Sequence, residues 1–149
     1  MNRKEVFEAC LERLNKHVRE LENRMNELKD AIENESKSSA GDKHETGRAM
    51  IHLEQENAGR ELEEALLQRN FLHQSELVEI SDSVVTGSLI YTGKIYIYIA
   101  VAIGKIKLGE VDVMVISPAS PLGLKLLGKK KGDSLLLNNN TFLIQEIIN

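Results

Sequence analysis

Two carboxylates near the first third of the chain are the side chains whose type and spacing are best suited to chemistry. Asp42 and Glu45 stand three positions apart in the run Gly41-Asp42-Lys43-His44-Glu45-Thr46. At the start of a helix, two such carboxylates can share a divalent cation, and their hard oxygen atoms suit Mg²⁺. The same spacing also forms a capping box, in which each carboxylate accepts backbone N–H groups at the helix N-terminus. The spacing alone leaves both interpretations open.

Other candidate chemistry in the sequence is weaker. His44-Glu45 begins a zinc-protease pattern, but Arg48 occupies the position that needs a second histidine. Arg48 could instead form an ion pair with one of the two acids. Cys10 is the only cysteine, so no internal disulfide and no cysteine-rich zinc site can form.

The charge and hydropathy of the chain narrow the function classes. The net charge is -4, with acids and bases interspersed, which disfavours duplex DNA binding as the main activity. No stretch approaches the roughly 20 apolar residues of a membrane span, and the N-terminus lacks the apolar region of a signal peptide. We therefore expect a cytoplasmic protein that has no membrane partner.

The elements that position the acids are two long helices. Apolar residues with alternating spacings of four and three predict a coiled-coil helix of roughly 40 Å, with one narrow buried stripe. These residues are Phe7, Leu11, Leu14, Val18, Leu21, Met25, Leu28 and Ile32. The small polar residues 34–41 then predict a bend.

A second helix is predicted from about Asp42 to His73, with a less regular apolar face. Its candidate buried residues are Met50, Leu53, Leu62, Ala65, Leu66 and Leu72, and the polar Asn57 and Arg69 interrupt them. We expect residues 1–75 to form an antiparallel helical hairpin that has its acidic tip near residues 36–47. The alternative is a coiled coil between chains, as in an oligomerising adaptor; we expect a monomer.

The second half changes to a period of two, which predicts a β domain over residues 76–149. Ile95, Ile97, Ile99 and Val101 share one face of a strand, and Tyr96 and Tyr98 share the other. Further strands are expected over residues 84–91, 111–116, 134–137 and 142–148. One short helix is expected after Ser120, which suits the N-cap, with Pro121 in the first turn and Gly128 at the C-terminus. The fold class is therefore α+β.

Two motifs resemble the Gre family of bacterial transcript-cleavage factors. At the bend, the Gly-Asp pair followed by two residues and Glu is similar to the tip of the Gre hairpin. A longer motif resembles the C-terminal signature of the family: Ser117-Pro118-Ala119-Ser120-Pro121-Leu122-Gly123, then Leu126-Leu127-Gly128-Lys129, then Gly132-Asp133. Together the hairpin and the following domain cover essentially the whole chain.

The resemblance implies a fold and a partner. The C-terminal region would be an FKBP-like antiparallel β-sheet domain with one short helix, and it would dock on bacterial RNA polymerase. Ser117, Pro118, Ser120, Pro121 and Gly123 are the docking residues that this implies. The domain would be a binding module, because the chain has too few aromatic residues for the pocket of a prolyl isomerase.

The resemblance also implies an activity. The hairpin would enter the secondary channel of the polymerase, where Asp42 and Glu45 would help hold the second Mg²⁺ of the active centre. The protein would then be an accessory elongation factor, not an enzyme, that stimulates cleavage of backtracked RNA by the polymerase and meets the nascent RNA 3′ end only indirectly. The chain would need no cofactor in isolation, and no sequence-specific DNA binding is implied.

The sequence departs from the family pattern directly after the tip. The family usually continues with Asn-Ala-Glu-Tyr, whereas this chain has Thr46-Gly47-Arg48-Ala49-Met50 and so lacks the aromatic residue that could meet RNA. Arg48 could contact RNA near the tip. The departure supports an alternative function, a regulator or inhibitor that occupies the channel without promoting cleavage. Gly47 also weakens the first helical turns, by roughly 1 kcal/mol relative to Ala.

Overall fold

A computed structural model describes residues 1–36 and 42–148. The bend was predicted over residues 34–41, but residues 34–36 are helical; residues 37–41 lie outside the described residues, and so do the side chains of residues 36 and 42–44. The chain forms two compact units, one made of Arg13–Arg69 and the other of Met1–Glu12 together with Asn70–Asn149. The predicted boundary after residue 75 stays a prediction.

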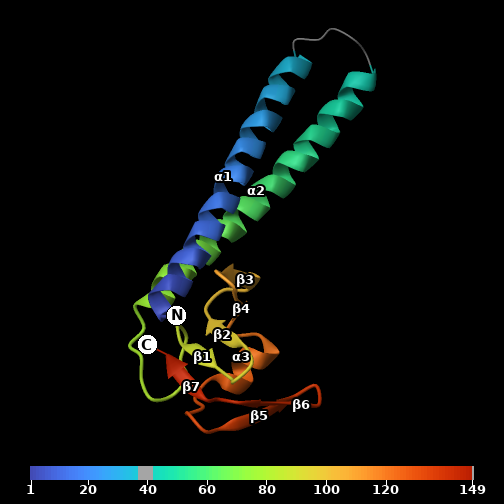
Figure 1. Ribbon diagram of the computed structural model, residues 1–149. Coiled ribbons are helices and arrows are strands. Elements are labelled where there is room, and N and C mark those ends of the chain that lie inside the picture. The colour runs from blue at the N-terminus through green and yellow to red at the C-terminus, as the bar shows by residue number, and fades with distance from the viewer. Residues whose placement is uncertain (37–41, 149) are drawn as a thin grey trace. The chain divides into compact units, whose positions relative to one another are not determined.

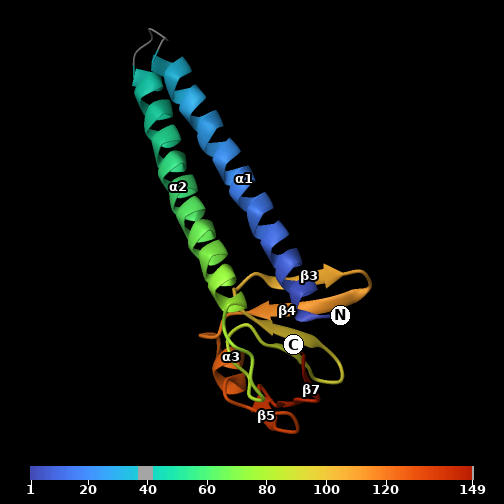
Figure 2. The ribbon, with the colours of Figure 1, turned by 90° about the vertical axis from the view of Figure 1, so that its left-hand side faces the viewer.

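The Arg13–Arg69 unit consists of the paired parts of two long helices, α1 (Arg3–Ser36) and α2 (Asp42–Glu76). The two helices lie side by side in both ribbon views (Figures 1 and 2). Their contacts run in opposite directions along the chain: Arg69 Nη1 donates to Asn15 Oδ1 at 3.2 Å, whereas Glu54 meets Arg24 at 2.6 Å. The helices therefore pair antiparallel within one chain, as the hairpin prediction requires.

The predicted seam of α1 is confirmed. Leu14, Val18, Leu21 and Leu28 are buried, each with at most 7% of its surface exposed. Val18 and Leu21 pack with Ala65 and the partly buried Leu62 of α2. The spacing of four and three thus identified the face of α1 that its partner helix covers.

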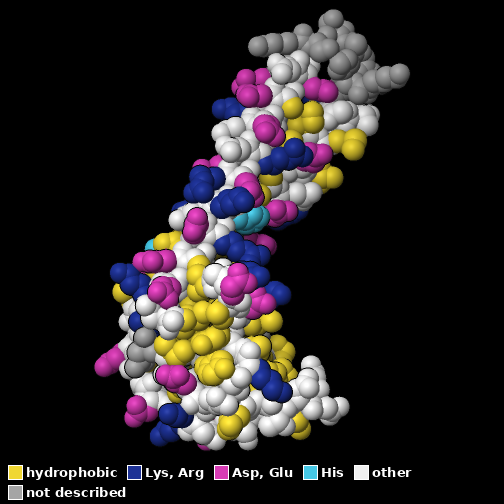
Figure 3. Space-filling model, in the orientation of Figure 1, with side chains coloured by type: hydrophobic (Ala, Val, Ile, Leu, Met, Phe, Trp, Pro, Cys, Tyr) yellow, Lys and Arg dark blue, Asp and Glu magenta, His cyan; other side chains and the backbone are white. Residues whose placement is uncertain are grey.

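The prediction for α2 was partly wrong. Leu62 and Ala65 do face α1, but Met50 and Leu53 are 63% and 56% exposed, and Leu66 is also exposed. Hydrophobic side chains are visible on the surface of this helix in Figure 3. The inward face mixes apolar, small and polar residues, so hydropathy alone does not reveal it. These residues follow a spacing of four and three: Ile51, Gln55, Ala58, Leu62, Ala65 and Arg69.

The other unit contains a five-stranded sheet in the order β3-β4-β2-β1-β7. Its strands are β1 (Leu89–Tyr91), β2 (Tyr96–Ile99), β3 (Gly104–Leu108), β4 (Val111–Ile116) and β7 (Glu146–Ile148). The expected purely antiparallel sheet was wrong, because β2 and β4 pair parallel, from Tyr96 with Val113 to Ile99 with Ile116. The sheet is mixed because β3 lies outside β4, so β4 returns beside β2 in the same direction.

A separate two-stranded hairpin, β5 (Ser134–Leu137) and β6 (Asn140–Leu143), precedes β7. The strands predicted at 111–116 and 134–137 are confirmed, whereas β3 was not predicted. The strand expected over 142–148 is divided, because Ile144 leaves β6 and its N–H donates to Asp133 O at 2.9 Å. The strand expected over 84–91 is shorter, because Val84 N–H donates to Lys129 O at 2.7 Å, outside the sheet.

Both faces of the five-stranded sheet are buried near its centre. On one face a core forms between the sheet, the short helix α3 (Pro121–Leu126) and the β5–β6 hairpin, from Val84, Ile90, Ile97, Ile99, Leu126, Leu135 and Ile144. Tyr98 alternates with these residues and points to the opposite face, where Arg3, Cys10 and Ser75 are its neighbours. The first turns of α1 and the end of α2 therefore belong to the core of this unit.

Within residues 1–36 and 42–148, no helix has an apolar stretch long enough to cross a membrane. Charged side chains are interspersed along both long helices, beside the exposed hydrophobic side chains of α2. Dark blue and magenta side chains alternate along them in Figure 3.

Candidate functional site

Glu45 and Arg48 are exposed side chains in the first turns of α2. Asp42 is the first residue of this helix, but the position of its carboxylate lies outside the described residues. Residues three apart lie on one face of a helix, so Glu45 shares a face with Arg48 and with the position of Asp42. A cation ligand pair and a capping box both remain predictions for Asp42 and Glu45.

A further acid, which the sequence analysis missed, lies against the same part of α2. A Cβ atom added at Gly47 would be 3.0 Å from Oε1 and 3.4 Å from Oε2 of Glu35. The Glu35 side chain is partly buried although it stands next to the end of α1. A signal was present, because Glu35 continues the sevenfold series of Leu14, Leu21 and Leu28 and therefore occupies a position that faces α2.

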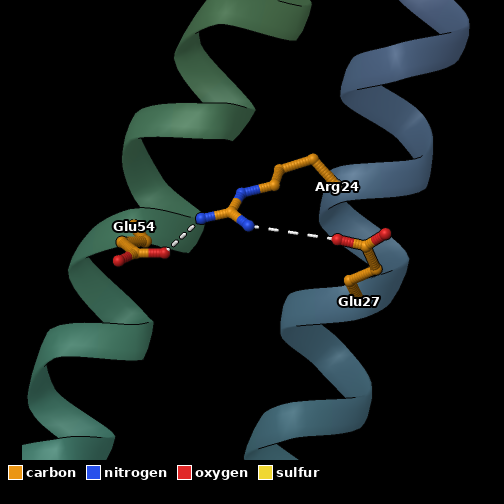
Figure 4. A network of polar contacts seen from close by, with 3 residues as sticks. All are labelled: Arg24, Glu27 and Glu54. Carbon is orange, nitrogen blue, oxygen red and sulfur yellow. Dashed lines mark hydrogen bonds and ion pairs between the residues drawn. The ribbon is translucent and has the colours of Figure 1, made fainter.

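Polar contacts hold the paired helices in register below this region. Arg24 Nη2 on α1 lies 2.6 Å from Glu54 Oε2 on α2, and Arg24 Nη1 lies 3.9 Å from Glu27 Oε2 on its own helix (Figure 4). The Arg24 and Glu54 side chains are each 51% exposed, so the pair stabilises the hairpin only weakly. Its effect is to favour one alignment of the helices.

The Ser-Pro-Ala-Ser-Pro-Leu-Gly motif folds into a tight turn that opens α3. The backbone N–H and the hydroxyl of Ser120 both donate to Ser117 O, at 3.1 and 2.6 Å. Gly123 N–H donates to Ser120 Oγ at 3.1 Å, which confirms Ser120 as the N-cap. Pro121 is the first helical residue and Gly128 follows the helix with φ +81, both as predicted. These contacts explain much of the motif by local folding.

Gly123 is required by a close approach of the backbone. A Cβ atom at this position would lie 2.2 Å from Ser117 O and 3.0 Å from Pro118 Cα. Gly123 is buried, and of the five predicted docking residues only Pro121 is exposed. Ser120 and Gly123 therefore shape the turn, whereas Pro121 and the neighbouring Leu124, which is 64% exposed, are available to a partner. Sequence analysis did not single out Leu124.

A surface pocket of about 480 Å³ lies elsewhere on the same unit, lined by Ser81, Asp82, Lys130, Lys131, Glu146 and Ile147. Its side chains carry both charges, and Lys130 N–H already donates to Asp133 Oδ2 at 2.8 Å. The mixture of two lysines and two acids does not select one ligand chemistry. The pocket therefore gives no functional assignment.

Tyr98 is the buried titratable group of the sheet. Its side chain is fully buried, and burial raises its pKa to about 12. The neighbouring Ser75 hydroxyl, which donates to Leu72 O at 2.7 Å, acts on the pKa of Tyr98 in the opposite direction. Tyr98 is therefore a core residue. Among the described residues it has no contact with the tip acids.

Comparisons with known proteins add no assignment to this geometry. No protein-family model matches the chain, and no curated protein does either. Among the described residues, no three His, Cys, Asp or Glu side chains are grouped closely enough to hold a metal ion.

Proposed function

We propose that this protein is a Gre-like accessory factor that binds bacterial RNA polymerase and stimulates cleavage of backtracked RNA by the polymerase. The observation that carries the proposal is the position of Glu45. It is exposed in the first turns of α2, at the end of an antiparallel helix pair where the chain passes from α1 to α2. A paired-helix arm can carry such a carboxylate into a narrow channel that a globular domain would not enter.

The chemistry requires the polymerase. When bound in the active centre, the second Mg²⁺ stabilises the attacking and leaving oxygen atoms of phosphodiester hydrolysis. The exposed carboxylate of Glu45 fits this role because hard oxygen ligands are those that Mg²⁺ prefers. We propose that Asp42 supplies the second carboxylate. The polymerase would supply the remaining ligands, so neither acid would bind the ion strongly without it. Arg48, exposed on the same helix face, can contact the RNA phosphates.

The second part of the proposal assigns docking to the sheet-containing unit, which we propose is FKBP-like and acts without isomerase activity. Exposed Pro121 and Leu124 beside the Ser117–Ser120 turn give it a rigid, partly apolar contact surface. We also propose that the protein is cytoplasmic. We propose that it is a monomer, because α2 of the same chain already covers the seam of α1 that could otherwise pair between chains.

The test is the cleavage of stalled elongation complexes by purified bacterial RNA polymerase. Wild-type protein is compared with Asp42→Asn/Glu45→Gln, and binding to the polymerase is measured for both. Stimulation that disappears in the double variant while binding persists supports the proposal. Equal cleavage with the wild type, with the double variant and without added protein removes the catalytic role.

A second candidate is a channel-occupying regulator without cleavage activity. It is favoured by the residues that follow Glu45: Arg48 and Met50 are exposed, and no aromatic side chain lies in residues 46–50. This candidate predicts polymerase binding and altered initiation or pausing, with the same RNA cleavage in the presence and absence of the protein. Cleavage that depends on the tip acids contradicts it.

A further inference from the structure

Gly47 is an unexpected residue in the first turns of a long helix. Glycine weakens a helix because its backbone loses the most conformational freedom on folding. The backbone of Gly47 gives no reason for glycine, because it is helical and is not one of the glycines with positive φ. The space around position 47 offers another reason for glycine at this position.

The carboxylate of Glu35 occupies the space beside Gly47. A Cβ atom at position 47 would lie 3.0, 3.4 and 3.5 Å from Oε1, Oε2 and Cδ of Glu35, and the 3.0 Å contact is closer than side chains normally pack. The Glu35 Oε2 atom is buried. A charged side chain near a helix end usually extends into solvent, whereas this carboxylate lies partly buried against the first turns of α2.

The other glycine of α2 provides a comparison. A Cβ atom at Gly59 would meet only Met25 Cε, at 3.9 Å, which is an ordinary contact. Both glycines face α1, yet only Gly47 makes room that an alanine would fill. The contact of Glu35 with Gly47 is therefore a specific feature of this end of the hairpin.

We propose that Glu35 is a positioning residue for Glu45. Its carboxylate, seated in the space left by Gly47, fixes the last turn of α1 against the first turns of α2, and so holds the turn that presents Glu45. The inference rests on the proposed function for its consequence in cleavage. The contact itself can be tested in the isolated protein.

The first test measures backbone amide hydrogen exchange in the isolated protein. Glu35→Ala should speed exchange of the amides of residues 47–51 by about tenfold, because the first turns of α2 open more often. Gly47→Ala should speed it less, because alanine favours the helix by about 1 kcal/mol relative to glycine. The matched controls are Asn34→Ala, an exposed neighbour, and Gly59→Ala; both should leave these amides unchanged. Unchanged amide exchange in Glu35→Ala overturns the proposal, whether or not the protein stimulates RNA cleavage by the polymerase.

The second test measures cleavage in stalled elongation complexes over a range of protein concentrations. Glu35→Ala should lower the maximal cleavage rate at least threefold while the half-saturating concentration stays the same. Glu35→Gln, which keeps the shape of the side chain, should retain at least half of the wild-type rate. Gly47→Ala should lower the rate of the wild type but not that of Glu35→Ala, because the added methyl group displaces the carboxylate only where the carboxylate is present.

The outcomes separate this inference from the proposed function. If the wild-type protein gives no stimulation, the proposed function fails, and the exchange experiment alone decides whether the contact exists. If the wild type stimulates cleavage and Glu35→Ala matches it, the positioning role fails and the proposed function stands. A Glu35→Gln variant as defective as Glu35→Ala also overturns positioning by contact.

Discussion

The guanidinium of Arg24 on α1 lies 2.6 Å from the carboxylate of Glu54 on α2, so the two helices are linked about halfway along their paired length. Both side chains are half exposed, and the contact therefore sets alignment more than stability.

Replacing one partner of this pair should have a small effect. Arg24→Ala should lower the free energy of unfolding by about 0.5 kcal/mol, since exposed ion pairs are screened by solvent. The exchanged pair, Arg24→Glu with Glu54→Arg, should recover most of the loss. Urea unfolding followed by circular dichroism measures both, and a loss several times larger would contradict a weakly coupled surface pair.

The observed seam predicts unequal costs for two leucines of the hairpin. Leu21 is 7% exposed, whereas Leu53 is 56% exposed. Leu21→Ala should lower the free energy of unfolding by about 2–4 kcal/mol through lost burial and a residual cavity. Leu53→Ala should change it by less than about 0.5 kcal/mol. Thermal unfolding of the two variants compares them directly. A larger loss of stability for Leu53→Ala than for Leu21→Ala would mean that Leu53 lies on the buried face of α2, as hydropathy predicted.

The turn before α3 predicts that folding and docking can be separated. Gly123→Ala places a Cβ atom 2.2 Å from Ser117 O, and it should destabilise the protein by about 2 kcal/mol or more. Leu124→Ala, at a 64% exposed side chain, should keep the melting temperature and weaken polymerase binding about tenfold. Binding by surface plasmon resonance beside calorimetric melting tests this; unchanged binding of Leu124→Ala removes Leu124 from the docking surface.

Tyr98 predicts a loss of stability at alkaline pH. Its pKa is about 12 in the folded chain and 10.0 in the ordinary case, so between these values the unfolded chain has released a proton that the folded chain keeps. The free energy of unfolding should then fall by about 1 kcal/mol per pH unit from this group. Tyr98→Phe should remove that part of the decline, because phenylalanine has no group that titrates. Parallel declines of wild type and variant contradict this.

The sequence predicted features that local spacing controls. The heptad of Leu14, Leu21 and Leu28 identified the buried face of α1, and Ser120, Pro121 and Gly128 correctly placed the ends of α3. Both succeed because they depend on contacts within a few residues along the chain, or on one repeated period. The predicted partner and activity rest on the family resemblance and stay predictions.

The predictions that were wrong concern features that depend on contacts between segments far apart in the sequence. Ala65 packs against Val18 and Leu21 of α1, and Ala58 is also buried, whereas Met50 and Leu53 face solvent. The parallel pairing of β2 with β4 depends on where β3 turns back, which alternation does not encode. The contact of Glu35 with Gly47 depends on how the two helices are aligned. The heptad series of α1 could therefore indicate only that Glu35 faces α2.

The claim on which this account depends is that the arm delivers Asp42 and Glu45 to a metal centre. The most direct measurement is the Mg²⁺ dependence of RNA cleavage in a stalled elongation complex. Wild-type protein should lower the Mg²⁺ concentration for half-maximal cleavage at least tenfold, and Asp42→Asn/Glu45→Gln should abolish that shift while still binding the polymerase. An identical Mg²⁺ dependence for wild type and double variant, with both bound, would contradict the account.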